Sequence, residues 1–426
     1  MGLGLLGRGI NVVKFLAENG AKLSVTDLKT KRELDPALKA LKEYKNIKFI
    51  LGEHRLSDFV DCDIVIKAAG VPLDSPYIRE AKKHRIPIEM DASLFAKLAP
   101  KGVAIVGVTG TKGKSTATDL IFRILKAGGK RAFLGGNVKG MATLPLLKKV
   151  KKGDFVVLEL DSWQLQGFGD AKISPHVGVF TNFMQDHLNY YRGSMDAYFR
   201  DKANIFRFQS KSDYLVTTRK ILSEADRRKI SRKGTAIIYT RALPKTWKLK
   251  VVGRHLRDSV EAATKTALLL GIDKASIKKA VESFTGVPGR LQYVGERKGV
   301  KFYNDTTATV PVSAINAIKT FPERKVVLLA GGADKGLEYE SMARELKKRI
   351  KAVILFKGSA TDKIKSALPR GFSYSEVNSM KEALICAREK AERGDIILLS
   401  PGAASFGIFK NEFDRGEQFI RGVLKA

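Results

Sequence analysis

The sequence predicts an α/β protein with three domains, each an open, mostly parallel sheet flanked by helices. Two observations lead to this prediction. Short apolar runs typical of buried strands alternate with stretches of helical periodicity along the chain. Two glycine-rich segments, Gly2–Gly7 and Gly110–Ser115, each precede a helical stretch, as glycines do where α/β proteins bind phosphate groups. A length of 426 residues allows about two to four domains.

The first predicted domain, residues 1–95, is expected to be a small doubly wound unit. Apolar residues recur at helical spacing over residues 10–17, and strand-like runs follow at Lys22–Thr26 and Asp61–Ala68. Only Met1 precedes the glycine motif. We therefore expect the strand that normally precedes such a motif to be missing, which would weaken ligand binding and the stability of this domain.

The second predicted domain covers residues 96–288 and the third covers residues 289–426. Several runs in both are too apolar to face water and are expected to be buried parallel strands. These strands are predicted at Val103–Val108, Phe155–Leu160 and Val177–Asn182 in the second domain, and at Val300–Asn304, Val326–Ala330, Ala352–Phe356 and Ile396–Leu399 in the third.

Charge is the unusual feature of the composition, because 77 basic and 44 acidic residues give a net charge of +33. Such a field attracts anions, so nucleic acid or a highly phosphorylated substrate are both candidate partners. Alternatively, most lysines only solvate helix faces, since they are scattered and aromatic residues are not interleaved with them. Two distant cysteines, Cys62 and Cys386, fit a reducing cytosol, and no apolar run is long enough to predict a membrane span.

The segment Gly110-Thr111-Lys112-Gly113-Lys114-Ser115-Thr116 has the pattern of a phosphate-binding loop. It lies between an apolar strand and an amphipathic helix, where glycines let backbone N–H groups approach phosphate oxygens and the helix N-terminus adds positive charge. Lys114 would reach the β- and γ-phosphates of a nucleotide, and the Ser115 hydroxyl would bind Mg²⁺. The alternative is a glycine turn without a ligand, which the flanking strand and helix disfavour.

Two further sites follow predicted strands of the same domain. Glu159 lies at the end of a strand, where a carboxylate can hold Mg²⁺ directly or through water, although an ordinary strand-end acid is as common. Asp186-His187 follows the next strand, and this pair suggests either a second metal site or a turn.

Further motifs are spread over nearly the whole chain. Together with the phosphate loop they are Gly110–Thr116, Gly135-Gly136-Asn137, Leu158–Leu165, Thr181-Asn182 with Asp186-His187-Leu188, Tyr198 with Lys202, Asn304–Thr309, Gly331–Gly336, Leu399–Phe406 and Phe409-Lys410-Asn411. This set resembles the motifs of the Mur ligase family. The glutamine-bearing strand end, Leu158–Leu165, and the serine motif, Leu399–Phe406, favour the members that add D-glutamate.

The resemblance implies a monomeric cytoplasmic ligase with a UDP-sugar domain, a central ATPase domain with a phosphate loop, and an amino-acid domain. It implies that ATP phosphorylates the carboxylate of UDP-N-acetylmuramoyl-L-alanine and that the amine of D-glutamate attacks the acyl phosphate, with two Mg²⁺ ions neutralising charge. Nucleic acid and membrane partners are not expected.

The resemblance also implies residue roles. One Mg²⁺ would be held by Ser115 and Glu159, and the other by His187 and a carbamylated Lys202. Lys114, His187 and Lys202 would be the catalytic residues. The expected binding residues are Asn137 and Gln164 for the muramoyl part, Asp27 for the uridine, Gly110–Thr116, Arg290 and Asp305 for ATP, and Thr309, Lys335, Ser405 and Phe406 for D-glutamate.

Some positions depart from the family pattern. Leu256 and Ser259 replace asparagines expected near the adenine, and Asp161 replaces a common serine. Asp27 also has a second interpretation, the ribose-binding acid of a dinucleotide fold, because it follows the first glycines by about 20 residues.

Three alternative functions remain at this stage. The chain could be a family member that adds another amino acid, including a folate-glutamylating enzyme. It could be a nucleic-acid binder, or a dinucleotide oxidoreductase predicted from Gly2–Gly7 alone, although such an enzyme has no use for the phosphate loop.

Overall fold

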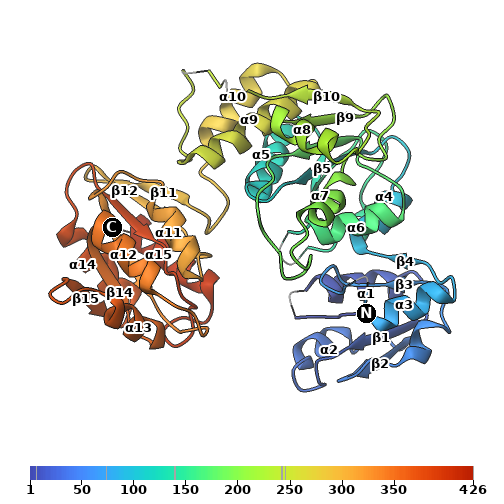
Figure 1. Cartoon of the computed structure of the whole chain (residues 1–426), viewed down its shortest axis with the longest axis horizontal. Coiled ribbons are helices and arrows are strands. Elements are labelled where there is room, and N and C mark those ends of the chain that lie inside the picture. The colour runs from blue at the N-terminus through green and yellow to red at the C-terminus, as the bar shows by residue number, and fades with distance from the viewer. Residues whose placement is uncertain (6, 73, 139–140, 241–242, 245, 426) are drawn as a thin grey trace. The chain divides into compact units, whose positions relative to one another are not determined.

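The computed structural model describes residues 1–5, 7–72, 74–138, 141–240, 243–244 and 246–425, apart from the side chains of Arg254 and His255. Leu6, within the predicted first glycine motif, lies outside them. The chain forms two compact units, Met1–Pro244 with Asp258–Val281, and Lys245–Arg257 with Glu282–Ala426 (Figure 1). Parallel sheets flanked by helices confirm the predicted fold class, whereas the domain boundaries at residues 95 and 288 stay predictions.

The first 100 residues contain two short parallel strand pairs, β1 with β2 and β3 with β4. Residues 1–5 form no strand. Met1 and Gly2 nevertheless bond to both pairs, because Gly2 N donates to Thr26 O at 2.8 Å and Met1 N donates to Ile66 O at 2.9 Å. The elements are α1 (Arg8–Glu18), β1 (Leu23–Asp27), α2 (Asp35–Leu41), β2 (Ile47–Leu51), η1 (Leu56–Phe59), β3 (Val65–Ile66), α3 (Pro76–Lys83), β4 (Ile88–Glu89) and α4 (Asp91–Leu98).

The second sheet of the first unit is parallel throughout, with the strand order β10-β9-β8-β5-β7-β6. The predicted strands are present, with ends shifted by one or two residues. The elements are β5 (Ala104–Thr109), α5 (Lys114–Ala127), β6 (Ala132–Gly136), η2 (Leu144–Lys148), β7 (Phe155–Glu159), α6 (Ser162–Asp170), β8 (Val177–Phe180), α7 (Met195–Ala203), β9 (Tyr214–Thr217), α8 (Arg219–Arg227), β10 (Thr235–Ile238), α9 (Arg254–Leu269) and α10 (Lys274–Ser283).

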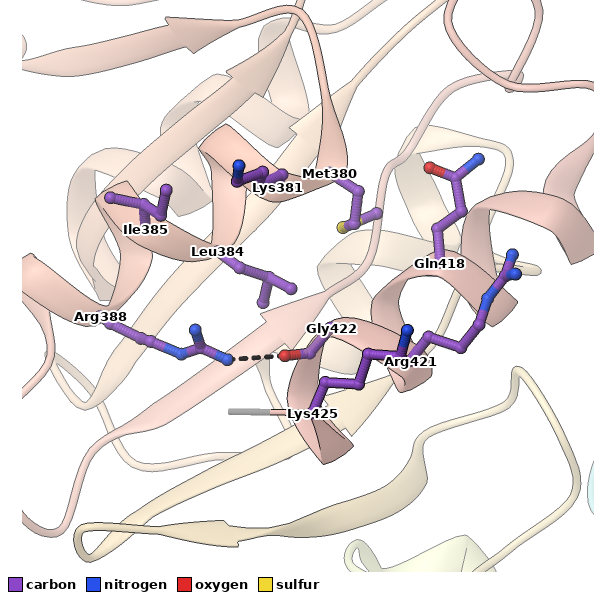
Figure 2. A pocket seen from close by; sticks show the side chains of 9 residues that line it. All are labelled: Met380, Lys381, Leu384, Ile385, Arg388, Gln418, Arg421, Gly422 and Lys425. Carbon is purple, nitrogen blue, oxygen red and sulfur yellow. Dashed lines mark hydrogen bonds between the residues drawn. The ribbon is translucent and has the colours of Figure 1, made fainter.

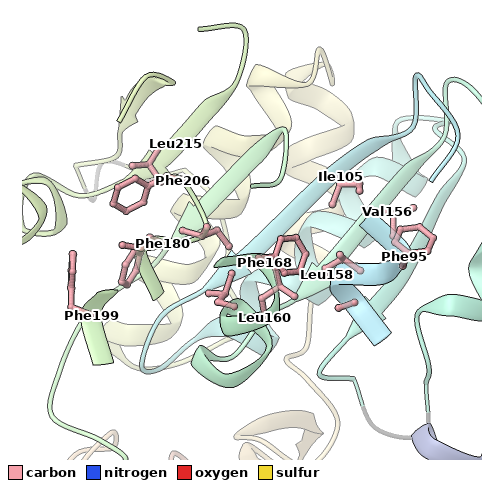
Figure 3. Close-up of a cluster of buried hydrophobic side chains, with 14 of the residues drawn as sticks. Phe95, Ile105, Val156, Leu158, Leu160, Phe168, Phe180, Phe199, Phe206 and Leu215 are labelled. Atoms are coloured by element: carbon pink, nitrogen blue, oxygen red, sulfur yellow. The ribbon is translucent and has the colours of Figure 1, made fainter. Parts of the chain in front are cut away.

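Side chains alternate between the two faces of this sheet, as the pleat requires. Strand residues such as Ile105 and Leu158 face a cluster that contains Phe168 of α6 and Phe199 of α7 (Figure 3). The other face, which includes Val106, packs against α5. Burial on both faces explains why the central strands are continuously apolar in the sequence.

The second unit contains a six-stranded sheet with the order β11-β12-β16-β13-β14-β15, in which only the β11–β12 pair is antiparallel. The four predicted strands are present. The sequence analysis missed β11 and β15, because the residues of these edge strands are mostly exposed or half-exposed and form no apolar run. The elements are β11 (Gln292–Arg297), β12 (Val300–Asn304), α11 (Pro311–Ile318), β13 (Val326–Gly331), α12 (Glu340–Arg349), β14 (Ile350–Phe356), α13 (Ser359–Ala367), β15 (Tyr374–Val377), α14 (Met380–Lys390), β16 (Ile396–Leu399) and α15 (Glu412–Leu424).

Helices α14 and α15 share a buried cluster with one face of this sheet. The parallel strands bring the loops that follow β12, β13 and β16 to one edge, as they bring the loops after β5, β7 and β8 to one edge in the first unit. Among the helices of the described residues, we find none with the length and apolar character needed to cross a membrane.

Candidate active site

The predicted phosphate loop connects β5 to α5 and needs glycine at two positions. Gly110 has φ 147° and Gly113 has φ 80°, conformations that L-residues with a side chain rarely adopt. A Cβ atom at Gly110 would lie 2.0 Å from Thr181 Oγ1. Both backbone conformation and space therefore restrict Gly110 to glycine.

Hydrogen bonds from the neighbouring strand end hold the loop in shape. Thr111 N donates to Asn182 O and Lys112 N donates to Asn182 Oδ1, each at 2.9 Å. The hydroxyl of Thr181 donates to Lys112 O, also at 2.9 Å. The pair Thr181-Asn182, which follows β8, therefore anchors the loop.

Lys114 is the first residue of α5, and its side chain turns back over the loop. Its Nζ donates to Gly110 O at 3.0 Å and to Thr111 O at 3.1 Å. Ser115 and Thr116 follow in the first turn of α5, where helical N–H groups lack partners within the helix. Ammonium, N–H groups and the helix dipole together form an anion site, which a nucleotide phosphate would fill.

Glu159 and Asn137 are adjacent because β6 pairs with β7. Glu159 is buried at the end of β7, level with Val108 of β5. Asn137 N donates to Glu159 O at 2.6 Å, and the Asn137 amide lies 3.5 Å from Glu159 Oε1. The structure thus places a carboxylate on the strand beside the phosphate loop.

The buried Gln164 side chain takes part in a helix cap. Its Oε1 accepts from Asp161 N at 3.2 Å, while Asp161 Oδ1 accepts from Gln164 N at 2.8 Å. This capping box begins α6. Asp161 can therefore cap the helix at a position where a serine is common in the family. A role of Gln164 in binding the muramoyl group stays a prediction.

His187 and Lys202 lie against the same ring. Lys202 Nζ is 4.9 Å from the centroid of the Tyr198 ring, and the rings of His187 and Tyr198 are 6.0 Å apart. Trp163, which the sequence analysis did not single out, lies 4.9 Å from the His187 ring. Two residues assigned to one metal site therefore both approach the Tyr198 ring.

Lys202 is 1% exposed, and its Nζ donates to Gly110 O at 2.9 Å. Burial, with repulsion from Lys114, lowers the pKa of Lys202 to about 7. A large fraction of this lysine is thus neutral near physiological pH, in contrast to a lysine on the surface.

Lys202 should contribute more to stability as the pH rises from about 7 to about 10. In this window the unfolded lysine, with a pKa of 10.5, holds a proton that the folded one has lost. We expect the free energy of unfolding of the wild type, minus that of Lys202→Met, to increase with pH in urea denaturation without bicarbonate. A difference independent of pH would contradict the lowered pKa.

In the second unit, the loops after β12, β16 and β13 are joined by hydrogen bonds. Gly402 N donates to Ala308 O at 2.8 Å, and Ala333 and Ala404 exchange two backbone bonds of 3.0 Å. Lys335 Nζ donates to Thr309 Oγ1 at 3.2 Å. Two residues predicted to bind D-glutamate are therefore in contact.

Ser405 and Phe406 extend one of these loops. Ser405 is buried, whereas the Phe406 side chain is 65% exposed. The serine is held beside the Ala333–Ala404 bridge, and the aromatic ring is available to a ligand.

Asp305 is buried, and both of its carboxylate oxygens accept hydrogen bonds from within the protein. Its Oδ2 accepts from Ser400 Oγ at 2.8 Å and its Oδ1 accepts from Leu291 N at 3.1 Å. Burial raises the pKa of Asp305 to about 7. Arg290, the other residue predicted to bind ATP in this unit, precedes Leu291 and is exposed. Contact between the Asp305 carboxylate and a ribose stays a prediction.

Arg415 of α15 is fully buried and was missed by the sequence analysis. Its Nε donates to Thr306 Oγ1 at 3.1 Å, and its Nη2 donates to Thr306 O at 2.9 Å and to Ala403 O at 3.4 Å. Burial lowers the pKa of Arg415 to about 10. The guanidinium thereby links the loops that carry Asp305 and Ser405.

Replacement of Arg415 by lysine should lower the free energy of unfolding by about 1–3 kcal/mol, because one ammonium cannot reach all three oxygens and leaves buried acceptors unsatisfied. Urea denaturation measures this loss. The control is Arg421→Lys, an exposed position on the same helix, which should change stability by less than about 0.5 kcal/mol. Equal stability of both variants would contradict this role.

Asp27 ends β1 and is buried beside the first glycine motif. Its Oδ2 accepts from Gly4 N and its Oδ1 accepts from Lys29 N, both at 2.9 Å. Asp27 therefore fixes the shape of the glycine loop. Neither of its two predicted roles, at a uridine or at a ribose, is tested by these contacts.

The fold and the phosphate loop define a nucleotide-binding α/β protein. Residues 108–264 match the Mur ligase middle domain, residues 289–402 match the Mur ligase glutamate ligase domain, and residues 1–89 match the MurD-like N-terminal domain. These matches cover most of the chain. The chain belongs to the Mur ligase family.

Curated relatives match over nearly their full length. A UDP-N-acetylmuramoylalanine–D-glutamate ligase of Roseiflexus sp. (strain RS-1) is 38% identical, covering 99% of this chain and 97% of that protein. A protein of the same name from Borreliella afzelii (strain PKo) is 34% identical, covering 98% and 95%.

Solved structures share the fold. The MurC ligase of Thermotoga maritima has a TM-score of 0.56 at 21% identity, covering 100% of this chain and 98% of that one. The MurF ligase of Thermotoga maritima, solved with ADP, has a TM-score of 0.56 at 18% identity, covering 94% and 95%.

Proposed function

We propose that this protein joins D-glutamate to UDP-N-acetylmuramoyl-L-alanine at the expense of ATP, in the synthesis of peptidoglycan precursors. The names of the relatives from Roseiflexus and Borreliella support this substrate pair. The structural observation that carries the proposal is the burial of Lys202 against Gly110 of the phosphate loop, 92 residues away in the sequence.

Phosphate binding is the first task of the site. The γ-phosphate of ATP replaces the carbonyl oxygens of Gly110 and Thr111 as partner of the Lys114 ammonium, while N–H groups at the start of α5 bind further phosphate oxygens. A carboxylate oxygen of the muramoyl substrate then attacks the γ-phosphorus, ADP leaves, and an acyl phosphate forms. Lys114 stabilises the charge that develops on the transferred group.

Oxygen donors near the loop fit magnesium. The described residues hold no group of three His, Cys, Asp or Glu side chains that could bind a metal. This is compatible with Mg²⁺ bound to a nucleotide, because such an ion needs only one or two protein ligands beside phosphate and water. Ser115 and Glu159 would hold one ion, and His187 and Lys202 the second. When bound, these ions neutralise the repulsion between carboxylate and triphosphate.

Lys202 would act as a carbamate. Its neutral amine, favoured by burial, adds to CO₂ and loses a proton, which turns the buried amine into an anion with two oxygen ligands. The negative charge would also relieve the repulsion between Lys202 and Lys114.

Amide formation follows. Lys335 and Thr309, with Ser405 and Phe406, would bind the carboxylates and carbon chain of D-glutamate. The neutral amine attacks the acyl carbon, and the tetrahedral intermediate expels phosphate and loses a proton. Arg415 supports this step indirectly, because it holds Thr306 and Ala403 in place.

The remaining assignments are also proposals. Asn137 and Gln164 would contact the muramoyl part and Asp27 the uridine, whereas Arg290 and Asp305 would contact ATP. Near the adenine, Ser259 replaces a family asparagine and donates to Gly113 O at 3.2 Å, so it contributes to the loop. We also propose domain boundaries near residues 95 and 288, a cytoplasmic monomer, and roles in cell shape and cell division.

A second candidate is a family member that adds another amino acid or that glutamylates folate. The solved fold relatives include a folylpolyglutamate synthase with a TM-score of 0.55 at 14% identity, covering 79% of this chain and 92% of that one. Substrate-dependent phosphate release distinguishes the candidates.

The protein should release phosphate from ATP and Mg²⁺ only when UDP-N-acetylmuramoyl-L-alanine and D-glutamate are both present. The test compares D-glutamate with L-glutamate, L-lysine and meso-diaminopimelate, and compares the sugar nucleotide with tetrahydrofolate. Release that is equal without D-glutamate, or that requires folate, would reject the proposed substrates.

Lys114→Ala should lower turnover at least about 100-fold, because the transferred phosphate loses the positive charge that stabilises it. Circular dichroism and thermal unfolding check that the variant is folded. Lys126→Ala is the matched control and should retain activity, since Lys126 is an exposed lysine in the last turn of the same helix, α5. Retained activity of Lys114→Ala would refute the function of the loop.

Lys202→Ala should also be inactive, but short carboxylates such as formate or acetate should restore part of the activity by replacing the carbamate. The readout is phosphate release against carboxylate concentration, with chloride at equal ionic strength as control. An active Lys202→Ala variant, or equal rescue by chloride, would argue against the carbamate.

A further inference from the structure

A groove between α14 and α15 has no role in the proposed reaction (Figure 2). Its volume is about 410 Å³, within the range of pockets that bind small ligands or anchoring side chains. None of its lining residues is among those proposed to bind ATP or D-glutamate. The lining residues are Met380, Lys381, Leu384, Ile385, Arg388, Gln418, Arg421, Gly422 and Lys425.

This lining combines apolar surface with positive charge. Met380 and Leu384 form a buried apolar floor, and Ile385 beside them is 46% exposed. Four of the nine lining residues are basic and none is acidic. A helix face that is only solvated usually carries both acidic and basic residues. Outside the groove, α14 does carry acidic residues, since Glu382 and Glu389 are exposed there.

The groove is built into the packing of the two helices. A Cβ atom at Gly422 would lie 2.4 Å from Leu384 Cδ1, so α15 approaches α14 closely at this glycine. Arg388 Nη2 donates to Gly422 O at 2.8 Å and bridges the helices, as Figure 2 shows. A fixed arginine beside an apolar floor is preorganised for an anionic, partly apolar group.

We propose that this groove binds an acidic amphipathic segment of a protein partner, with apolar side chains on the exposed Ile385 above the Met380–Leu384 floor and carboxylates beside Arg421 and Lys425. Charge complementarity selects this occupant. The lining has no aromatic residue on which bases could stack, which disfavours nucleic acid. The apolar floor is recessed, whereas a membrane surface needs protruding apolar residues.

The test uses the full-length protein and a fluorescein-labelled helical peptide with leucines at i, i+3, i+4 and i+7 flanked by glutamates. Fluorescence anisotropy should show saturable binding, and a scrambled peptide of the same composition should bind at least about 10-fold more weakly. Equal binding of both peptides, or no binding, would overturn the proposal. Displacement by anionic phospholipid vesicles, or tighter binding of single-stranded DNA that the groove variants abolish, would also overturn it.

Charge reversal locates the site. Arg421→Glu/Lys425→Glu should weaken peptide binding at least about 10-fold. Lys347→Glu/Lys348→Glu makes the same change in net charge at exposed residues in the last turn of α12 and should leave binding within about 2-fold. Equal losses would mean that the peptide responds only to the net charge of +33.

A variant without a charge change tests the apolar contact. Ile385→Ser should weaken peptide binding about 3-fold or more while leaving ligase activity unchanged, since Ile385 is exposed and is not among the residues proposed to bind substrate or carry out the reaction. Unchanged binding of this variant would refute the apolar part of the proposal.

Discussion

Two lysines share one carbonyl oxygen. Lys114 and Lys202 both donate to Gly110 O, at a residue whose backbone conformation and surroundings admit only glycine. Burial of the Lys202 ammonium lowers its pKa first of all, and repulsion from the half-buried Lys114 lowers it further. A phosphate at the loop would offset the positive charge of Lys114, which is why this arrangement suits an anionic ligand.

Parallel sheets explain how distant motifs meet. In the first unit, the phosphate loop follows β5, Glu159 ends β7, and Thr181-Asn182 follows β8. In the second unit, loops after β12, β16 and β13 carry Asp305, Ser405 and Lys335, and Arg415 ties two of these loops together. Each unit thus concentrates polar groups where its strands end, beside a cluster of buried apolar side chains.

Three aspartates among the predicted site residues and motifs accept hydrogen bonds that hold the surrounding backbone in place. Asp27 accepts two backbone N–H groups, Asp161 begins α6 through a capping box, and Asp305 is held by Ser400. Such hydrogen bonds hold the loops of a site in a fixed geometry. They also show why a motif residue can position a site in addition to any contact with substrate.

Patterns of residues close together in the chain predicted the central strands and the phosphate loop. The continuous apolar runs specified the central strands, because burial on both faces demands them, and the pattern around Gly110–Ser115 specified a phosphate loop. The Mur ligase resemblance is confirmed by the matching domains and relatives. Weakly apolar edge strands such as β11 and β15 escaped the analysis, since hydrogen bonding to a neighbour, and not their own periodicity, defines them.

The sequence by itself indicated the family, the central strands and the phosphate loop, because these depend on residue types at short spacing. Tertiary structure alone decided that Lys202 is buried against that loop, that Arg415 bridges two others, and that α14 and α15 leave a basic groove between them. Burial and long-range contact set the charge state of a lysine and the partner of an arginine. Neither property is encoded in the residues that adjoin them in the chain.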